Sequence, residues 1–459
     1  MSAVASDKFF WLAYCKAVQQ LIGNKPGKDS AIFFATKAQK GPPASALIPA
    51  EYTNNGLYQI GDNLLSADNM FYIPSAQNSY IRSLQNYLSY VDVEADQSEA
   101  VVTKYLMTQK VLNSAIEVAA AEQDKAVAQF EKNKNLGLTG DYTFAQWYPQ
   151  HAPAYTNALL EVNAAAGENK AAIGDMNGPV AAQYSQDRDK ITQALTSLTA
   201  VPGIAMGACA DSPATAVEIA QNKGQVPPPK SVRYVPTYMS ADYTKTVKDW
   251  MNQLSHGKPG KNIQSIKMSN GRNVDESEFG QETLEGDLSF SYAPWLSFAA
   301  SGSSDHESQL DKTDINENDI EIAMTYDDIK TVPISPGDWN IGDPKSSYPK
   351  LKEGAPITAK ILVAPTQLVL AKNLGYTIKF KNNLKTTFGK TVKDTKQVGG
   401  YVRIFGIPIS VDGNYKKSSQ QTSHVATWDE TSGEFVVVPT DDGGFATVIA
   451  IQGDKIHTI

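Results

Sequence analysis

Apolar residues in this chain change their spacing near residues 226–230, a segment that contains three consecutive prolines. Upstream they recur every three or four residues, which is the period of a helix, and downstream every second residue, which is the period of a strand. A proline run is stiff and extended, so it predicts a linker. We therefore expect an α+β protein with a mainly helical, bundle-like domain at 1–225 and an antiparallel, sandwich-like β domain at 231–459. A chain of 459 residues is long enough for two such cores.

The longest helix signal covers residues 98–134, which contain no glycine or proline and are rich in Ala, Glu, Gln and Lys. A set of mostly apolar residues in it largely follows one helical stripe. The stripe consists of Val101, Tyr105, Leu112, Ile116, Ala119, Gln123, Val127 and Phe130. Two further helices are predicted at 155–172 and 180–198, separated by glycines and a proline. Antiparallel packing of these three helices is the economical arrangement.

Shorter signals precede and follow this helical region. Residues 9–22 and 78–91 carry helical stripes, and the apolar run at 31–35 fits a strand or a piece of helix. Strand patterns dominate after residue 231. They cover residues 288–298, 319–326, 357–370, 376–380, 401–411, 424–428, 434–438 and 445–451.

Two segments of the second half invite a more specific interpretation. Residues 435–449 read as a hairpin around the turn residues Asp441, Asp442, Gly443 and Gly444. Residues 372–396 are basic, and we interpret them as the solvated face of a strand, with contact to phosphates or anionic headgroups as the alternative.

The chain shows no motif of a known catalytic site. A Gly-x-Ser-x-Gly elbow and an H-E-x-x-H pair are absent, and the loop at 23–30 has the wrong spacing and an Asp at the magnesium position of a phosphate loop. We therefore expect a protein without enzymatic activity or cofactor. An active site assembled from distant residues stays open as an alternative, because geometry rather than spacing defines such a site.

One acidic segment resembles the start of a calcium loop. Asp314, Asn316 and Asn318 place oxygen ligands at alternating positions. The rest of the pattern departs from such a loop, since Asp319 stands at the position of the bend glycine and Thr325 at that of the bidentate Glu. These three residues are candidate metal ligands, and the alternative is an ordinary loop that enters a strand.

Charge, cysteine content and targeting signals narrow the class of protein to which this chain can belong. A net charge of -8 lacks the basic footprint of a nucleic-acid-binding protein. Cys15 and Cys209 are too few for a disulfide framework, and two buried free thiols are expected, although a single bond between them is the alternative. No signal peptide pattern is visible, and no window reaches the ~18 apolar residues of a membrane span. We expect a cytoplasmic product, or one released by lysis or a non-classical route.

One segment keeps a role at membranes in view. Residues 288–298 alternate bulky apolar residues with serine, as does a membrane β-strand of ~9–11 residues. Phe290, Tyr292, Trp295 and Phe298 are the candidate membrane contacts. Any half-buried antiparallel strand alternates in the same way, which is the alternative.

Long alanine-rich helices followed by a β domain, without an enzyme motif or a leader, resemble the plan of leaderless two-part pore-forming toxins. The likeness is one of architecture. It implies a non-enzymatic, toxin-like or membrane-interacting protein that forms pores after oligomerisation, with a lipid surface and further copies of the chain as partners. The alternative function is that of a self-assembling structural, storage or interaction protein without catalytic activity.

Overall fold

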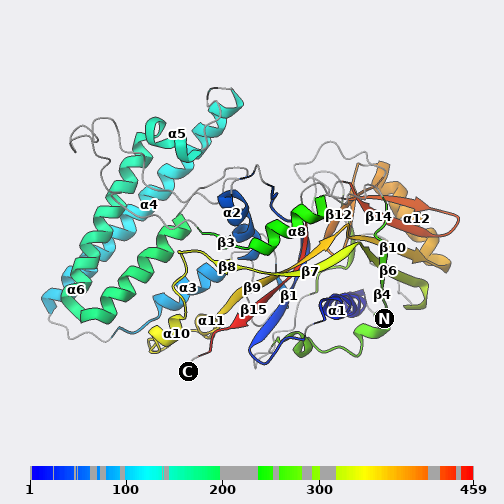
Figure 1. The fold of residues 1–459 in the computed structure, drawn as a ribbon, viewed down its shortest axis with the longest axis horizontal. Coiled ribbons are helices and arrows are strands. Elements are labelled where there is room, and N and C mark those ends of the chain that lie inside the picture. The colour runs from blue at the N-terminus through cyan, green and yellow to red at the C-terminus, as the bar shows by residue number, and fades with distance from the viewer. Residues whose placement is uncertain are drawn as a thin grey trace.

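The protein folds as an α+β structure with two large sheets and a projecting pair of long helices (Figure 1). The structure is a computed structural model. It describes residues 3–23, 25–45, 48, 50–62, 70–72, 79–93, 99–136, 138, 144–196, 236–251, 258–281, 292–299, 317–397, 399–411, 424–440 and 446–457.

A five-stranded sheet forms the central layer. Its order is β2–β1–β15–β9–β7, antiparallel except for the β1–β2 pair. The strands are β2 (Phe71–Tyr72), β1 (Ser30–Lys40), β15 (Thr447–Lys455), β9 (Val363–Lys372) and β7 (Asp328–Pro333). Ile32 and Phe34 face one hydrophobic core, whereas Phe33 faces another. The continuous apolar run at 31–35 is thus a strand that is buried on both faces.

An eight-stranded sheet lies beside it, in the order β4–β6–β10–β14–β13–β12–β11–β5. All neighbours are antiparallel except β12 and β13. The strands are β4 (Asn262–Ile266), β6 (Ile320–Tyr326), β10 (Gly375–Phe380), β14 (Glu434–Pro439), β13 (His424–Asp429), β12 (Ile407–Val411), β11 (Tyr401–Ile404) and β5 (Leu296–Ala299). Buried and half-buried residues alternate along β14, as the sequence pattern predicts for a strand with one solvated face.

Helices cover these sheets. Helix α1 (Ala3–Ile22) and helix α12 (Asn382–Gln397) share the core of the eight-stranded sheet. Helices α2 (Ala50–Gly61), α3 (Tyr80–Ser89) and α8 (Ala241–Met251) share the core on the other face of the five-stranded sheet. The remaining short elements are β3 (Tyr238–Met239), β8 (Ser335–Pro336), α9 (Met268–Gly271), α10 (Pro344–Ser347), α11 (Ile357–Lys360), η1 (Glu276–Phe279) and η3 (Glu317–Asp319). We call the sheets and these elements together the body.

The two sides of the predicted domain boundary are not separate in this fold. Residues 226–230 lie outside the described residues, but β1 from the first half pairs with β15 from the second, and α1 packs under C-terminal strands. A strand that is buried on both faces needs a neighbouring strand at each edge and a covering layer on each face. For β1, many of these neighbouring and covering residues come from the chain beyond residue 320. Within the described residues, the first half of the chain is therefore not purely helical, because it supplies β1 and β2 to the five-stranded sheet.

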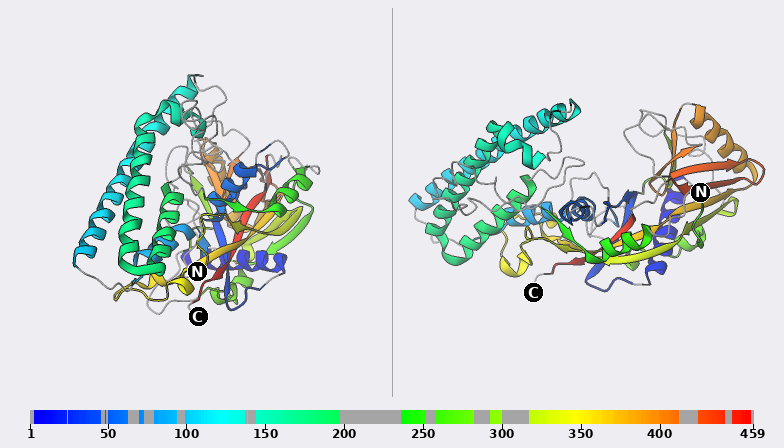
Figure 2. Two further views of the ribbon diagram at one scale, coloured as in Figure 1. Left: turned by 60° about the vertical axis from the view of Figure 1, so that its left-hand side comes forward. Right: turned by 45° about the horizontal axis from the view of Figure 1, so that its top comes forward.

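The helices that do stand apart are α4 (Glu99–Asn135), α5 (Phe144–His151) and α6 (Pro153–Thr196), which we call the arm. The predicted helix at 98–134 is confirmed as α4. The two helices predicted at 155–172 and 180–198 form one helical element, which bends sharply on itself (Figure 2). Glycines and a proline in such a run bend a helix when its packing partners hold both halves.

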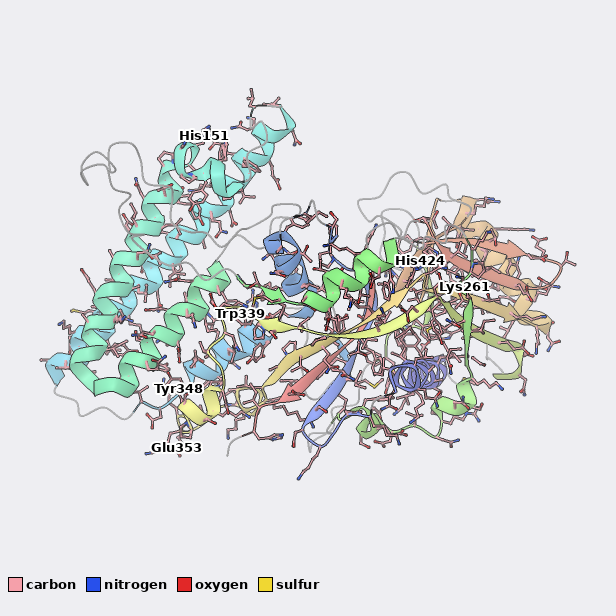
Figure 3. All side chains as sticks on the ribbon, in the orientation of Figure 1. His151, Lys261, Trp339, Tyr348, Glu353 and His424 are labelled. Carbon is pink, nitrogen blue, oxygen red and sulfur yellow. The ribbon has the colours of Figure 1, made fainter. Side chains whose placement is uncertain are left out.

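Tyrosine hydroxyls join the arm to the body. Tyr184 of α6 donates to the backbone oxygen of Leu88 at 2.6 Å, and Tyr348 donates to Asp187 Oδ2 of α6 at 2.7 Å. Tyr87 of α3 in turn donates to the backbone oxygen of Tyr348 at 2.6 Å. Figure 3 places Tyr348 at the junction. The rings of these three tyrosines are buried, and their hydroxyl groups are hydrogen-bonded. The base of the arm is therefore held both by apolar packing and by buried hydrogen bonds.

Several strand predictions are confirmed and three need correction. The hairpin predicted at 435–449 is wrong, because β14 pairs with β10 and β13, whereas β15 pairs with β1 and β9 of the other sheet. The first part of the strand predicted at 357–370 is helix α11. The basic stretch at 372–396 is only partly strand, since most of it forms α12.

Candidate interaction surface

The candidate metal ligands do not form a metal site in the part of the chain that is described. Asp314 and Asn316 lie outside the described residues, and Asn318 is exposed on η3. The neighbouring Asp319 accepts a hydrogen bond from Asn382 Nδ2 at 2.6 Å, which ties η3 to the start of α12. No group of three His, Cys, Asp or Glu side chains with metal-binding geometry occurs among the described residues.

Two of the candidate membrane contacts are core residues, which corrects that prediction. Trp295 stacks near Phe10 of α1 at 4.5 Å between ring centroids, and Phe298 lies 5.8 Å from Phe388 of α12. Both are buried, Tyr292 is half-buried, and Phe290 lies outside the described residues. In the described part of this segment, residues 292–298, the apolar side chains of Trp295 and Phe298 are thus buried against helices of the body, and only residues from Leu296 onward form β5. Among the described residues, no helix is long and apolar enough to cross a bilayer.

An open cleft of about 420 Å³ lies between α8, β4 and β7 and has a charged lining. The lining residues are Asp249, Trp250, Lys261, Asp327, Asp328, Lys330 and Lys372. Trp250 Nε1 donates to Asp328 Oδ2 at 3.1 Å, and the backbone N–H of Lys261 donates to Asp327 Oδ1 at 3.1 Å. Three carboxylates and three ammonium groups balance one another, and two of the carboxylates already join the surrounding elements. This cleft is therefore a poor candidate for an active site.

A buried carboxyl group lies at the end of α2. Asp62 accepts hydrogen bonds from the Tyr238 hydroxyl at 3.1 Å and from the Ile81 backbone N–H at 3.5 Å. Burial raises the pKa of Asp62 to about 7, although hydrogen bonds from Ser79, Tyr238 and Tyr58 favour its charged form. The Asp62 carboxyl joins α2, α3 and β3 and does not line the charged cleft. Its role in this fold is structural.

The expectation of buried free thiols is confirmed for Cys15, the one of the two cysteines that the structure describes. Cys15 of α1 is a buried free thiol, and burial raises its pKa well above the usual value. A thiol with a raised pKa is a poor nucleophile, so Cys15 is not a catalytic candidate. Cys209 lies outside the described residues.

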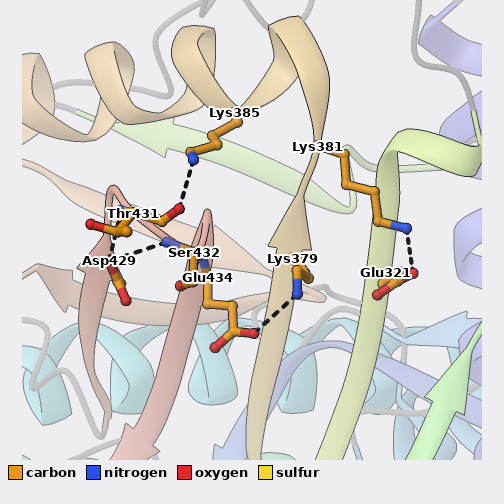
Figure 4. A network of polar contacts seen from close by, with 8 residues as sticks. All are labelled: Glu321, Lys379, Lys381, Lys385, Asp429, Thr431, Ser432 and Glu434. Atoms are coloured by element: carbon orange, nitrogen blue, oxygen red, sulfur yellow. Dashed lines mark hydrogen bonds and ion pairs between the residues drawn. The ribbon is translucent and has the colours of Figure 1, made fainter.

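Lysines of β10 and α12 are balanced locally (Figure 4). The contacts are Lys381 with Glu321, Lys379 with Glu434 at 3.6 Å, and Lys385 with the backbone oxygen of Thr431 at 2.8 Å. Exposed ion pairs of this kind contribute about 0–1 kcal/mol each. Two of these three lysines are paired with carboxylates and the third donates to a backbone oxygen, which favours the solvated-surface interpretation over a phosphate site.

The inner face of α4 packs on α6 through small residues. Leu112, Ala119 and Ala126 are buried on α4, at intervals of seven, and face the buried Ala158 and Ala165 of α6. Thr108 Oγ1 donates to Asn169 Oδ1 across the seam at 3.1 Å. Alanines at these positions let the two helix backbones approach closely, in the manner of an antiparallel coiled coil.

The outer face of α4 carries a second apolar stripe. Met107, Val111 and Val118 are 66%, 53% and 48% exposed. With the exposed Ser114 and Ala121 they follow intervals of four, three, four and three, which places all five on one side of the helix. We call these five residues the outer stripe. Figure 2 shows α4 on the outside of the arm, with α6 between it and the body.

Exposed apolar side chains concentrate on the arm. Of the nine large apolar residues that are exposed among the described residues, seven belong to α4, to α6 or to the turn after α4. In that turn, Leu136 and Leu138 are 63% and 69% exposed. A small aromatic cluster built around Phe130, Phe144 and Trp147 joins the end of α4 to α5. Contiguous exposed apolar residues commonly mark sites of protein or membrane contact.

The outer stripe leaves a trace in the sequence, as apolar residues outside the predicted stripe of this helix. The predicted stripe of 98–134 included Leu112 and Ala119 but left out Met107, Val111 and Val118, which fall on the opposite side. Apolar residues that do not fit the main stripe of a helix were the signal for a second face.

No protein-family model, curated protein or solved structure matches this chain.

Proposed function

We propose that this protein is a non-catalytic, self-assembling protein and that the arm is its assembly element. The observation that carries the proposal is the outer stripe: an apolar helical face on the outside of the arm, where no other element of the described chain covers it. Burying a Val or Met side chain completely contributes about 1.5–3 kcal/mol, so covering the outer stripe supplies a driving force for association.

A second copy of the chain is the occupant to which we commit. The inner face of α4 already packs against a helix through one larger side chain, Leu112, and small alanines. The outer stripe has the same make-up, with Val111 and Val118 next to Ser114 and Ala121, so another α4 offers a matching surface. Tightly packed helix pairs need this match of large and small residues.

The test is the molar mass of the purified protein as a function of concentration, measured by sedimentation equilibrium. The wild type is expected to self-associate, and Val111→Glu or Val118→Glu to raise the dissociation constant at least roughly tenfold, since each places a charge in the buried contact. The matched control is Ile263→Glu, because Ile263 is also β-branched and, at 70%, even more exposed, but lies on the edge strand β4. A wild type that stays monomeric at every concentration would refute the proposal, as would an assembly that only Ile263→Glu disrupts.

A membrane-contacting function is the second candidate, and the two exposed leucines after α4 are what favours it. Leu136 and Leu138 would insert at the level of the lipid headgroups. The test is release of dye from vesicles of neutral and anionic lipid at several pH values. Leakage that Leu136→Ser with Leu138→Ser abolishes supports this candidate; absence of both leakage and vesicle binding removes it.

A further inference from the structure

We propose that two copies pair through α4 in antiparallel orientation, about a two-fold axis that passes beside Glu117. This inference rests on the proposed self-assembly and adds the orientation, the register and the residues that set them. Its starting point is the spacing of the outer stripe, which is that of positions a and d in a coiled coil.

Side-chain size favours the antiparallel arrangement. With the axis beside Glu117, Val111 lies opposite Ala121 of the second copy, and Ser114 lies opposite Val118 of the second copy. Each valine then meets a small residue, so the two stripes interdigitate. A parallel pair in register would set Val111 against Val111 and Ala121 against Ala121, with crowding at one level and a gap at the other.

Charge favours the same arrangement. Lys110, Glu117 and Asp124 are exposed and follow one another at intervals of seven along one edge of the outer stripe. In the antiparallel pair, Lys110 lies opposite Asp124 of the second copy, and this ion pair occurs twice; Glu117 lies opposite its own copy once. In a parallel pair, Glu117 would instead face Glu122 of the second copy twice, and Lys110 would face Ala115. The antiparallel arrangement therefore has two attractive charge pairs and one repulsive pair, whereas the parallel arrangement has two repulsive pairs.

Access to the surface is consistent with pairing. Within the described residues, α4 packs on α5 and α6 and forms no substantial contact with the sheets. The stripe spans 14 intervals from Met107 to Ala121, which is about 21 Å of helix. A second arm lying along it would meet three turns of α4 or more before it reached the body.

Charge reversal tests the register. Lys110→Asp alone and Asp124→Lys alone are each expected to raise the dissociation constant roughly tenfold, because each converts two attractive pairs into two repulsive ones. The double variant is expected to return to within about threefold of the wild type. Lys390→Asp, an equal charge change on exposed α12, is the matched control and should leave association unchanged. A double variant that is weaker than both single variants would overturn the register.

Thiol cross-linking tests the orientation. In a Cys209→Ser background, with Cys15 buried, Glu117→Cys is expected to give a dimer with a short thiol cross-linker, whereas Val111→Cys is not, since its two copies would lie about 15 Å apart along the axis. If the wild type associates but only Val111→Cys cross-links, the pair is parallel and this inference fails while self-assembly stands. If the wild type is monomeric, both proposals fail together.

Discussion

The body and the arm bury their apolar residues in different ways. In the body, strands such as β1 are covered on both faces, and large aromatic side chains fill two continuous cores. In the arm, α4 has only one neighbouring layer, and its seam is built from alanines, so apolar residues on its other side stay exposed. Large apolar side chains are therefore mostly buried in the three-layered body, whereas the two-layered arm leaves several of them exposed.

The largest expected effect comes from breaking the aromatic packing of the body. Phe388 of α12 stacks on Phe380 at 3.9 Å between ring centroids and lies 5.0 Å from Trp428. Phe388→Ala is expected to lower the free energy of unfolding by about 3–5 kcal/mol, because it leaves a cavity among rigid rings. Urea unfolding followed by tryptophan fluorescence measures this loss.

The control for that substitution is Lys390→Ala, which truncates an exposed side chain on the same helix. It should change the free energy of unfolding by less than about 0.5 kcal/mol. Equal effects of Phe388→Ala and Lys390→Ala would contradict the packing described for α12.

A smaller effect, and one that depends on pH, is expected at the buried carboxyl group near the base of the arm. The pKa of Asp62 is raised from 3.8 to about 7 by burial. The folded state therefore holds this proton more tightly than the unfolded state, so its stabilising contribution is complete below about pH 4 and is lost as pH rises to about 7. Asp62→Asn removes that dependence, and its stability relative to the wild type should improve by about 2–4 kcal/mol between pH 4 and pH 7.

His424 in the eight-stranded sheet makes stability depend on pH in the opposite direction, so its effect has to be distinguished from that of Asp62. Burial lowers the pKa of His424 to about 4, although a hydrogen bond with the Leu374 backbone oxygen at 2.7 Å partly opposes this shift. Its contribution is lost as pH falls from about 6.5 to about 4. Stability curves of wild type and Asp62→Asn share this second slope, so only their difference reports Asp62. Parallel curves over pH 4–7 would show that the Asp62 carboxyl does not titrate as proposed.

Local patterns in the sequence predict individual helices and strands better than they predict which strands pair with one another. Helix α4 was predicted within about one residue, because 37 residues of strong helix formers leave no competing structure. The hairpin at 435–449 failed because turn residues show that the chain reverses but do not choose the neighbouring strand. Here β14 and β15 join different sheets, and the choice depends on β1, more than 400 residues earlier. Helix α12 was missed because its lysines hid a stripe of Leu384, Phe388 and Val392.

The candidate sites show the same limit. Trp295 and Phe298 were predicted as surface contacts because alternation gives the period of a strand but not the side that is buried. The outer stripe needed the structure, since only the packing of α4 on α6 shows which apolar face of α4 is left over.

The smallest expected effect sharpens the contrast within one helix. Ala119 and Ala121 are two residues apart on α4, but Ala119 is buried in the seam with α6 and Ala121 is exposed on the outer stripe. Ala119→Leu should lower the free energy of unfolding by about 1–3 kcal/mol, because the close helix pair has no room for a larger side chain. Ala121→Leu, an identical substitution with the same helix propensity, should change it by less than about 0.5 kcal/mol in the monomer. Thermal unfolding by circular dichroism at low concentration measures both. Equal destabilisation by the two variants would mean that the outer face of α4 is packed within its own chain, which would leave no free surface for a second copy.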